Sequence, residues 1–331
     1  MGSACVAEST ACPLCSADAE KKFLHDWKTY KWWDCPACGV AFVTPFKNPG
    51  AEFYADYADL YPHEAQEETD PMDPEFDDCL DSLGEGAGRK LLDIGCGGGG
   101  FLSRAKKAGF AVSGIDFNEV RLKLVREKLG VDTLYHGSLP DFAAAHPDER
   151  YDVITLFQVI EHLDHPAEWL SAARKLLKPG GRFFIGTPNR DRTFNPFQGP
   201  GMEEVDNPPN HLTRWRASSL QRFVEGCGFR VIEIKSLGVP LPLLALLLRN
   251  NLRLGLATKA LNVDQIQHAA PKTQADAPVG LKTSLVQIAV KLKELVINAA
   301  AFLIYPLFRL AFALFGWQGV VLYCLAELDK P

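Results

Sequence analysis

The sequence predicts an α/β fold in which helices flank an open, mainly parallel sheet. From residue 89 onward, short apolar runs alternate with segments of helical periodicity, which is typical of parallel strands joined by crossover helices. The first apolar run, 90–94, leads directly into a glycine-rich loop and the start of a helix. Such a loop lets a ligand approach the backbone closely, and the helix start behind it offers unpaired N–H groups.

The other elements of the sheet follow in order along the chain. We expect strands over 90–94, 111–115, 132–135, 151–157, 182–186, 229–236 and 320–326, and helices over 99–108, 118–129, 166–177 and 217–227. Pro179, Gly180 and Gly181 form the predicted stop signal between the third helix and the strand that follows it.

The glycine loop matches two cofactor patterns. Gly95, Gly97 and Gly100 satisfy the G-x-G-x-x-G pattern of dinucleotide binding, whereas Asp93, Gly95, Gly97 and Gly99 satisfy the acidic pattern of S-adenosylmethionine (SAM) binding. A carboxylate at Asp93 would repel a pyrophosphate, but it suits the ammonium and sulfonium groups of SAM. We therefore expect SAM as the cofactor, with a NAD-dependent oxidoreductase as an alternative.

Two further positions are expected to contact the nucleoside part of the cofactor. Asp116 ends the second strand, 19 residues after Gly97, where an acidic side chain can accept both ribose hydroxyls. This position serves NAD and SAM equally. Ser138 follows the third strand, and we expect it to lie at the adenine edge.

Four cysteines near the N-terminus have the spacing of a structural zinc site. Two C-x2-C pairs, separated by 19 residues, supply Cys12, Cys15, Cys35 and Cys38. Each pair can form a tight knuckle, and four thiolates complete a tetrahedral shell with no open position for catalysis. We interpret 1–46 as a zinc ribbon, whose small apolar core would come from the aromatic residues between the knuckles.

Composition excludes some classes of function and divides the chain. The net charge is −6 and there is no basic tract, so binding of nucleic acid through bulk charge is not expected. The N-terminus lacks the features of a secretory signal, and nine cysteines in this length favour a reducing cytosol. The expected domains are 1–46 as the zinc ribbon, 47–88 as a helical and aromatic lid and linker, 89–239 plus 319–331 as the cofactor domain, and 240–318 as an apolar, basic helical insertion.

Four blocks in this order resemble the class I SAM-dependent methyltransferases. They are the loop from Asp93 to Gly99, the acid Asp116, the block 157–163 (FQVIEHL) and the block 176–181 (LLKPGG). The resemblance implies a Rossmann-like seven-stranded sheet whose last strand is antiparallel. It also implies that Asp93 lies near the methionine amino group of SAM, and that Phe157 and Gln158 lie near the methionyl side. The zinc-ribbon start, the aromatic lid and the sequence Thr187-Pro188-Asn189 together resemble methyltransferases found in glycan and lipid pathways.

Glu161 and His162 are the first candidates for catalysis. In ubiquinone-type O-methyltransferases, which this block resembles, Glu-x-x-Glu-His at this place implies a divalent metal beside the acceptor hydroxyl. Here Gln158 replaces the first Glu, which removes an anionic oxygen and weakens a site for a hard cation. Glu161 and His162 could act as a base and its orienting partner, or they could fix the loop after the strand.

His211 is our candidate for the general base. It follows a long polar loop, 189–210, in which two prolines stiffen the approach to the histidine. An imidazole titrates near neutral pH, which suits removal of a hydroxyl proton during methyl transfer. The nearby Arg214 could hold an anionic group or pack on Trp215.

The insertion 240–318 differs in composition from the rest of the chain. It contains eight basic and three acidic residues, a net charge of +5, and an apolar stretch at 295–315 that is interrupted by Asn298, Pro306 and Arg309. A basic, apolar lobe suits docking on an anionic membrane surface without spanning it. A subunit interface, through which the chain could form an oligomer, a helical cap or a transmembrane hairpin remains an alternative.

Together these features predict a SAM-dependent methyltransferase, peripheral on the cytosolic face of a membrane. We expect O-methylation of a lipid-linked or membrane-surface acceptor, with a polyprenyl-linked glycan slightly ahead of a polyprenyl quinone. The alternatives are a methyltransferase for a soluble sugar or small metabolite, an oxidoreductase, and a non-catalytic adaptor with this fold.

Overall fold

The computed structural model describes residues 11–50, 53–54, 74–195, 203–239, 241, 244–245 and 280–329 of the 331-residue chain. Its side chains are described except at 280–294 and 311–312. The chain forms two compact units, one made of residues 1–238 with 317–331 and the other of residues 239–316.

The larger unit is built on a seven-stranded sheet with the strand order β10-β11-β8-β7-β4-β5-β6. The strands are β4 (Lys90–Ile94), β5 (Ala111–Asp116), β6 (Leu134–His136), β7 (Tyr151–Phe157), β8 (Leu177–Pro188), β10 (Arg230–Leu237) and β11 (Val321–Glu327). The strands from β4 to β8 pair in parallel, whereas β11 is antiparallel to both β8 and β10. The predicted α/β class and the antiparallel last strand are thus confirmed.

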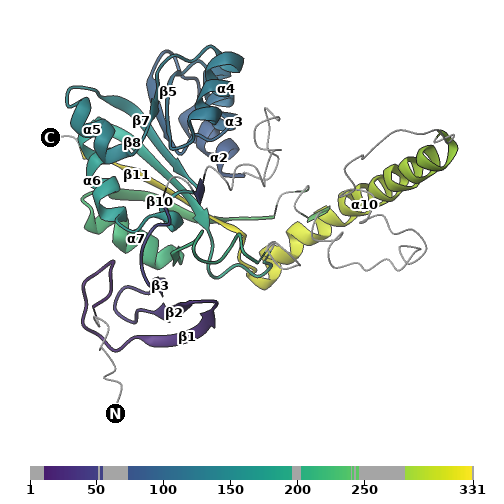
Figure 1. Cartoon of the computed structure of the whole chain (residues 1–331), viewed down its shortest axis with the longest axis horizontal. Helices are drawn as coiled ribbons and strands as arrows, with labels where there is room; N and C mark the ends of the chain where they lie inside the picture. The colour runs from purple at the N-terminus through teal and green to yellow at the C-terminus, as the bar shows by residue number, and fades with distance from the viewer. Residues whose placement is uncertain are drawn as a thin grey trace, which may run out of the picture. The chain divides into compact units, whose positions relative to one another are not determined.

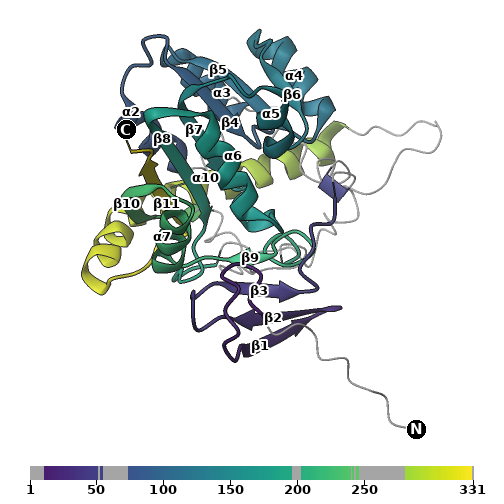
Figure 2. The same cartoon turned by 90° about the vertical axis from the view of Figure 1, so that its left-hand side faces the viewer.

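Helices cover both faces of this sheet (Figures 1 and 2). One side carries α2 (Pro74–Leu83), α3 (Gly100–Lys107) and α4 (Glu119–Leu129), and the other carries α5 (Leu139–Ala145), α6 (Pro166–Leu176) and α7 (Ala217–Gly226). Phe142, Leu170 and Leu220, from the second set, belong to one buried cluster with sheet residues such as Ile154. Burying these apolar side chains between helix and sheet stabilises the unit and fixes the loops at the strand ends.

The boundaries differ most from expectation at β8. The strand begins at Leu177, five residues before the predicted start, because the stop signal forms a bulge instead of a loop. Tyr151 pairs with Leu177, and the register then shifts so that Val153 pairs with Arg182. Gly180 makes this possible because its φ of 73° lies in the left-handed region. The short helix α5 was not predicted, whereas α2 lies in the segment 47–88 that was expected to form a helical and aromatic lid and linker.

A separate four-stranded sheet contains the cysteine knuckles. Its order is β1-β2-β3-β9, with β1 (Lys22–Trp27), β2 (Tyr30–Asp34), β3 (Ala41–Thr44) and β9 (Thr213–Arg214). Figure 2 shows β9 beside β3, where Phe42 pairs with Thr213. Trp32 is fully buried in the small core of this sheet. The strand β9 was not predicted, and it ties the segment after β8 to the N-terminal sheet.

The smaller unit contains the helix α10 (Gly280–Phe315), which continues through Pro306. Among the described residues, one stretch is long and apolar enough to cross a membrane, Leu295–Phe315, with a mean hydropathy of 1.8 and 12% of its 18-residue apolar window buried. Along this stretch large apolar side chains are exposed, among them Phe302, Leu303, Leu307 and Leu314.

Candidate functional site

The glycine loop after β4 adopts a backbone that only glycine accommodates easily. Gly95, Gly97 and Gly99 have φ angles of 72°, 49° and 81°. A Cβ on Gly95 would lie 2.4 Å from Cγ2 of Val159, so this glycine allows the loop to pack against the segment after β7. Gly99 precedes the first turn of α3. The loop and the segment 158–162 therefore line one edge of the sheet together.

Asp116 lies at this same edge, at the end of β5. Its carboxylate accepts backbone N–H bonds from Gly97 and Asn118, both at 2.8 Å. Burial raises the pKa of Asp116, although these two hydrogen bonds oppose the shift. Each oxygen has a second lone pair, so the carboxylate is held rigidly by the loop and can still accept hydroxyl groups.

Asp93 is buried beneath the loop, and Oγ1 of Thr155 donates to its carboxyl group at 2.6 Å. Burial raises the pKa of Asp93 to about 7, against the effect of the Thr155 hydrogen bond. Ser138 is the N-cap of α5, where its Oγ accepts a bond from the backbone N–H of Asp141. Its expected place at the adenine edge stays a prediction.

Gln158 has a partner that sequence reasoning missed. The residue has a φ of 53°, unusual for a side chain other than glycine, and its Nε2 donates to Oε1 of Glu75 at 2.6 Å. Glu75 is fully buried at the start of α2. The neighbouring Phe157 packs against Phe76 and Phe101. A carboxyl group from α2 thus lies beside the position where the resembled pattern carries its first Glu.

Glu161, His162 and His211 come together in one buried cluster. Their nearest ligand atoms all lie within 4.8 Å of one another, and the two imidazole rings are 4.8 Å apart. The predicted sites at 161–162 and at 211, some 50 residues apart in sequence, are therefore one site. The backbone bond from Leu212 N–H to the carbonyl of Glu161 holds the two segments together.

The groups in this cluster have perturbed protonation. Burial raises the pKa of Glu161 to about 8, and burial together with the charge of His211 lowers that of His162 to about 3. Oγ1 of Thr187 donates to Oε2 of Glu161 at 3.0 Å, while Oε1 is buried without a hydrogen-bond partner among the described residues. Nδ1 of His162 donates to the carbonyl of Asn210 at 2.8 Å. An acceptor hydroxyl or a cation would satisfy Oε1.

Asp206 is the second residue that sequence reasoning missed. Its Oδ1 lies 3.4 Å from Nδ1 of His211, long for a hydrogen bond but close for an electrostatic contact, and its Oδ2 is 2.5 Å from Nη2 of Arg192. Burial raises the pKa of Asp206, but His211, Arg192 and Arg214 outweigh it and lower the value to about 2. Burial lowers the pKa of His211, which Asp206 partly offsets. At neutral pH the pair is a neutral imidazole beside a carboxylate.

The aromatic stripe predicted as a lid is described only in part. Tyr57 and Tyr61 lie outside the described residues. The ring of Tyr54 lies 5.6 Å from that of His162, and its hydroxyl accepts a bond from Asn48. Tyr54 therefore borders the Glu161, His162 and His211 cluster.

The four N-terminal cysteines have the dimensions of a tetrahedral thiolate site. The Sγ atoms of Cys12 and Cys38 are 3.8 Å apart, those of Cys15 and Cys35 are 3.7 Å apart, and all four lie within 4.8 Å. Zinc–sulfur bonds of about 2.3 Å in a tetrahedron place sulfurs roughly 3.8 Å apart. The donor set and its spacing fit zinc.

Comparisons with known proteins agree with this geometry. A methyltransferase domain family matches residues 63–234. A ubiquinone biosynthesis O-methyltransferase of Thiobacillus denitrificans is 44% identical over 109 residues, 32% of this chain and 47% of that protein. One from Saccharophagus degradans is 33% identical over 166 residues, 45% of this chain and 70% of that protein. This chain thus spans about half the length of the first relative.

The [4+2]-cyclase SpnF has a similar crystal structure, with a TM-score of 0.51 and 15% identity over 86% of this chain and 98% of the cyclase. This likeness concerns the fold alone, and the fold evidently serves more than one reaction. The family match covers more than half of the chain, including the glycine loop and the segment from Phe157 to His162. The chain belongs to the class I SAM-dependent methyltransferases.

Proposed function

We propose that this protein transfers a methyl group from SAM to a hydroxyl oxygen of an acceptor that lies in the membrane surface. The observation that carries the proposal is the cluster of Glu161, His162 and His211 beside the glycine loop. Because two relatives carry the name ubiquinone biosynthesis O-methyltransferase, a polyprenyl quinone is favoured as the acceptor over the polyprenyl-linked glycan.

SAM would be held at the edge formed by the ends of β4 and β5. Gly95, Gly97 and Gly99 leave room for its approach to the backbone, and Asp116 would accept the ribose hydroxyls. Gln158 and Phe157 would face the methionyl side. Bound SAM supplies a methyl group already activated on a sulfonium, so the protein has only to align the acceptor, exclude water and remove a proton.

His211 would remove the proton from the acceptor hydroxyl. With Nδ1 turned to the carboxylate of Asp206, Nε2 of the neutral ring is left as the acceptor of a proton. Asp206 then stabilises the imidazolium that forms. Glu161, with its unsatisfied Oε1, would hydrogen-bond the hydroxyl and orient it.

The same cluster offers one carboxylate and two imidazoles to a divalent cation. This donor set suits a transition metal better than magnesium, which prefers oxygen ligands. A cation there would polarise the acceptor hydroxyl, but the proton transfer to His211 does not require one.

Structural zinc is proposed for Cys12, Cys15, Cys35 and Cys38. The spacing of their sulfur atoms supports this assignment, and a closed shell of four thiolates leaves it no direct part in methyl transfer. Its effect would be to hold the small sheet to which β9 belongs.

The unit 239–316 is proposed to dock on an anionic membrane from the cytosolic side. The large apolar side chains exposed along α10, with Leu303 74% and Phe315 71% exposed, support this role. The net charge of +5 over 240–318, in a chain of net charge −6, favours anionic lipid. A second subunit is the alternative occupant of this apolar surface.

The test is transfer of labelled methyl from SAM into an extract of the source cells, followed by separation into organic and aqueous phases. Label in the organic phase, lost in His211→Ala, is the expected result. Label only in the aqueous phase would favour a soluble sugar or metabolite as the acceptor. SAM binding without transfer in either phase would favour an adaptor, and tight NADH binding would favour an oxidoreductase.

A further inference from the structure

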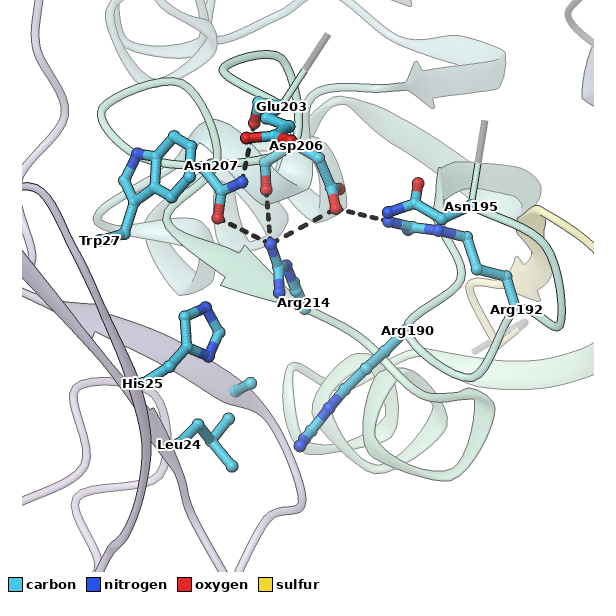
Figure 3. Close-up of a pocket in the computed structure, with 11 residues that line it drawn as sticks. Leu24, His25, Trp27, Arg190, Arg192, Asn195, Glu203, Asp206, Asn207 and Arg214 are labelled. Carbon is cyan, nitrogen blue, oxygen red and sulfur yellow. Dashed lines mark hydrogen bonds and ion pairs between the residues drawn. The ribbon is translucent and has the colours of Figure 1, made fainter. Parts of the chain in front are cut away.

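A cavity of about 530 Å³ opens between β1 and the loop after β8. Figure 3 shows three arginines, Arg190, Arg192 and Arg214, approaching it from one side, and Leu24, His25 and Trp27 of β1 facing them from the other. It lies on the other side of Asp206 from the His211 cluster, because Asp206 contacts both His211 and the arginines.

The three arginines are held in place by ion pairs and hydrogen bonds to Asp34 of β2 and to the loop after β8. Nη1 of Arg190 binds Asp34 at 2.8 Å, and Nη2 of Arg214 binds Oδ1 of Asn207 at 2.9 Å and the carbonyl of Asp206 at 2.8 Å. The guanidinium of Arg214 also stacks 4.2 Å above the ring of Trp32, not on Trp215 as considered above. Among the described residues, Nε of Arg214 is buried without a hydrogen-bond partner.

Arginines are the most numerous charged side chains in the cavity lining. Three of them line it together with two acids, Asp206 and Glu203, while Asp34 pairs with Arg190 from outside the lining. Burial lowers the pKa of Arg214, and Asp206 opposes this shift. The charges of Arg192 and Arg190 lower the pKa further. Burial also lowers the pKa of His25, with a further contribution from Arg214. Burial is the main cause of both shifts, and the charge of neighbouring arginines adds to it.

We propose that this cavity binds a phosphate ester, with the phosphoryl group among Arg190, Arg192 and Arg214 and its organic part against Leu24 and Trp27. A phosphoryl group offers only acceptors, and its several oxygens can engage guanidinium groups that converge from different directions. The cavity is large enough for the group attached to the phosphate as well. The ester could be a lipid headgroup or a soluble molecule.

Two variants and one control test the site. His25→Glu places a carboxylate on the exposed cavity wall and leaves the arginines' hydrogen-bond and ion-pair partners in place, and Arg190→Gln removes one of the three charges. Arg126→Gln, on the exposed face of α4, makes the same charge change elsewhere. Calorimetry with glycerol 3-phosphate and inorganic phosphate, against chloride at equal ionic strength, measures the soluble arm. Sedimentation with phosphatidylcholine vesicles, with and without phosphatidic acid, measures the lipid arm.

We expect one site per chain whose affinity for glycerol 3-phosphate falls at least tenfold in His25→Glu and Arg190→Gln, and is unchanged in Arg126→Gln. If the two variants also lose retention on phosphatidic acid vesicles, the ester is a headgroup; if their retention equals that of the wild type, it is soluble. The proposal is overturned if neither variant differs from the wild type in either arm. Because no step of the assay involves methyl transfer, failure of the proposed activity would leave this result unaffected.

Discussion

Oδ1 of Asp206 lies 3.4 Å from Nδ1 of His211, and both side chains are buried. The contact makes His211, which follows the polar loop, part of a carboxylate–imidazole pair. If His211 is the base, turnover must rise with pH as the imidazole loses its proton and then level off above its pKa, which burial holds below the ordinary value of 6.5.

Asp206→Asn tests this pair directly. Without the carboxylate the imidazolium is less stable, so the acidic limb of the pH profile of kcat should move to lower pH, and kcat on the plateau should fall about tenfold or more. Asp191→Asn, an exposed partner of Arg216 on the same loop, should leave the profile unchanged. A profile that does not move in Asp206→Asn would rule out His211 as the titrating base.

Ionisation of the buried Glu161 is expected to make the free energy of unfolding fall as pH rises above about 4.5. Its folded pKa of about 8 lies above the ordinary 4.5, so its contribution to stability is complete below pH 4.5 and is lost as pH rises toward 8. Glu161→Gln should remove this loss of unfolding free energy, which is about a few kcal/mol when the pKa shift is converted to a free energy. Urea unfolding at pH 5 and pH 8 measures it.

The same substitution should lower methyl transfer at least tenfold, because an amide cannot ionise and has one acceptor oxygen where the carboxyl group has two to orient the acceptor. A gain in stability with a loss of activity is the signature of a buried group kept for function. Equal unfolding free energies of Glu161→Gln and the wild type at both pH values would contradict the assigned burial of the charge.

The bond between Gln158 and Glu75 predicts the outcome of restoring the first Glu of the resembled pattern. Gln158→Glu would place two carboxyl groups where the side-chain atoms now lie 2.6 Å apart. The free energy of unfolding should therefore fall by about 1–3 kcal/mol. The exchanged pair Glu75→Gln with Gln158→Glu should recover most of that loss. A double-mutant cycle without coupling would show that the contact does not matter in solution.

The sheet could be predicted from the sequence because its signals are local. Strand 151–157 was predicted with its observed bounds, and 90–94 likewise, since both are apolar runs next to clear turn residues. The segment after Leu176 was misjudged because Pro179, Gly180 and Gly181 can form either a loop or a bulge, and only the pairing with β7 decides between them.

The candidate site could be predicted only in pieces. His162 and His211 were each identified from their own surroundings, but nothing local shows that their rings lie 4.8 Å apart. Glu75 lies 83 residues from Gln158, in a helix with no motif. For Asp206 the sequence signal is its place in a polar segment just before His211. Its role as the partner of the histidine is clear only from the structure, in which Arg192 and Arg214 also contact its carboxylate.

Removal of the proposed zinc should destabilise the small sheet and, through β9, the loop that carries His211. We expect one equivalent of zinc per chain by elemental analysis, and a lower midpoint of thermal unfolding after chelation. Cys35→Ser should lose the metal and show the same destabilisation. Cys227→Ser, outside the cluster, is the matched control and should retain zinc. Full zinc content in Cys35→Ser would refute the ligand assignment.

Membrane docking can be separated from catalysis because the two ends of the insertion meet. Leu237 of β10 pairs with Val321 of β11, and Gly319 packs so tightly against Leu237 that a Cβ there would lie 1.8 Å from its carbonyl oxygen. Deletion of 240–318 therefore leaves ends that a tight turn can join, and the sheet should fold and bind SAM with unchanged affinity. Retention on vesicles with anionic lipid should be lost, and transfer to a membrane acceptor should fall at least tenfold.

A milder variant, Leu303→Glu with Leu307→Glu, keeps the helix and should weaken retention alone. If the deletion variant still sediments with vesicles while the full chain elutes as a dimer that the deletion disrupts, the apolar surface of α10 is a subunit interface.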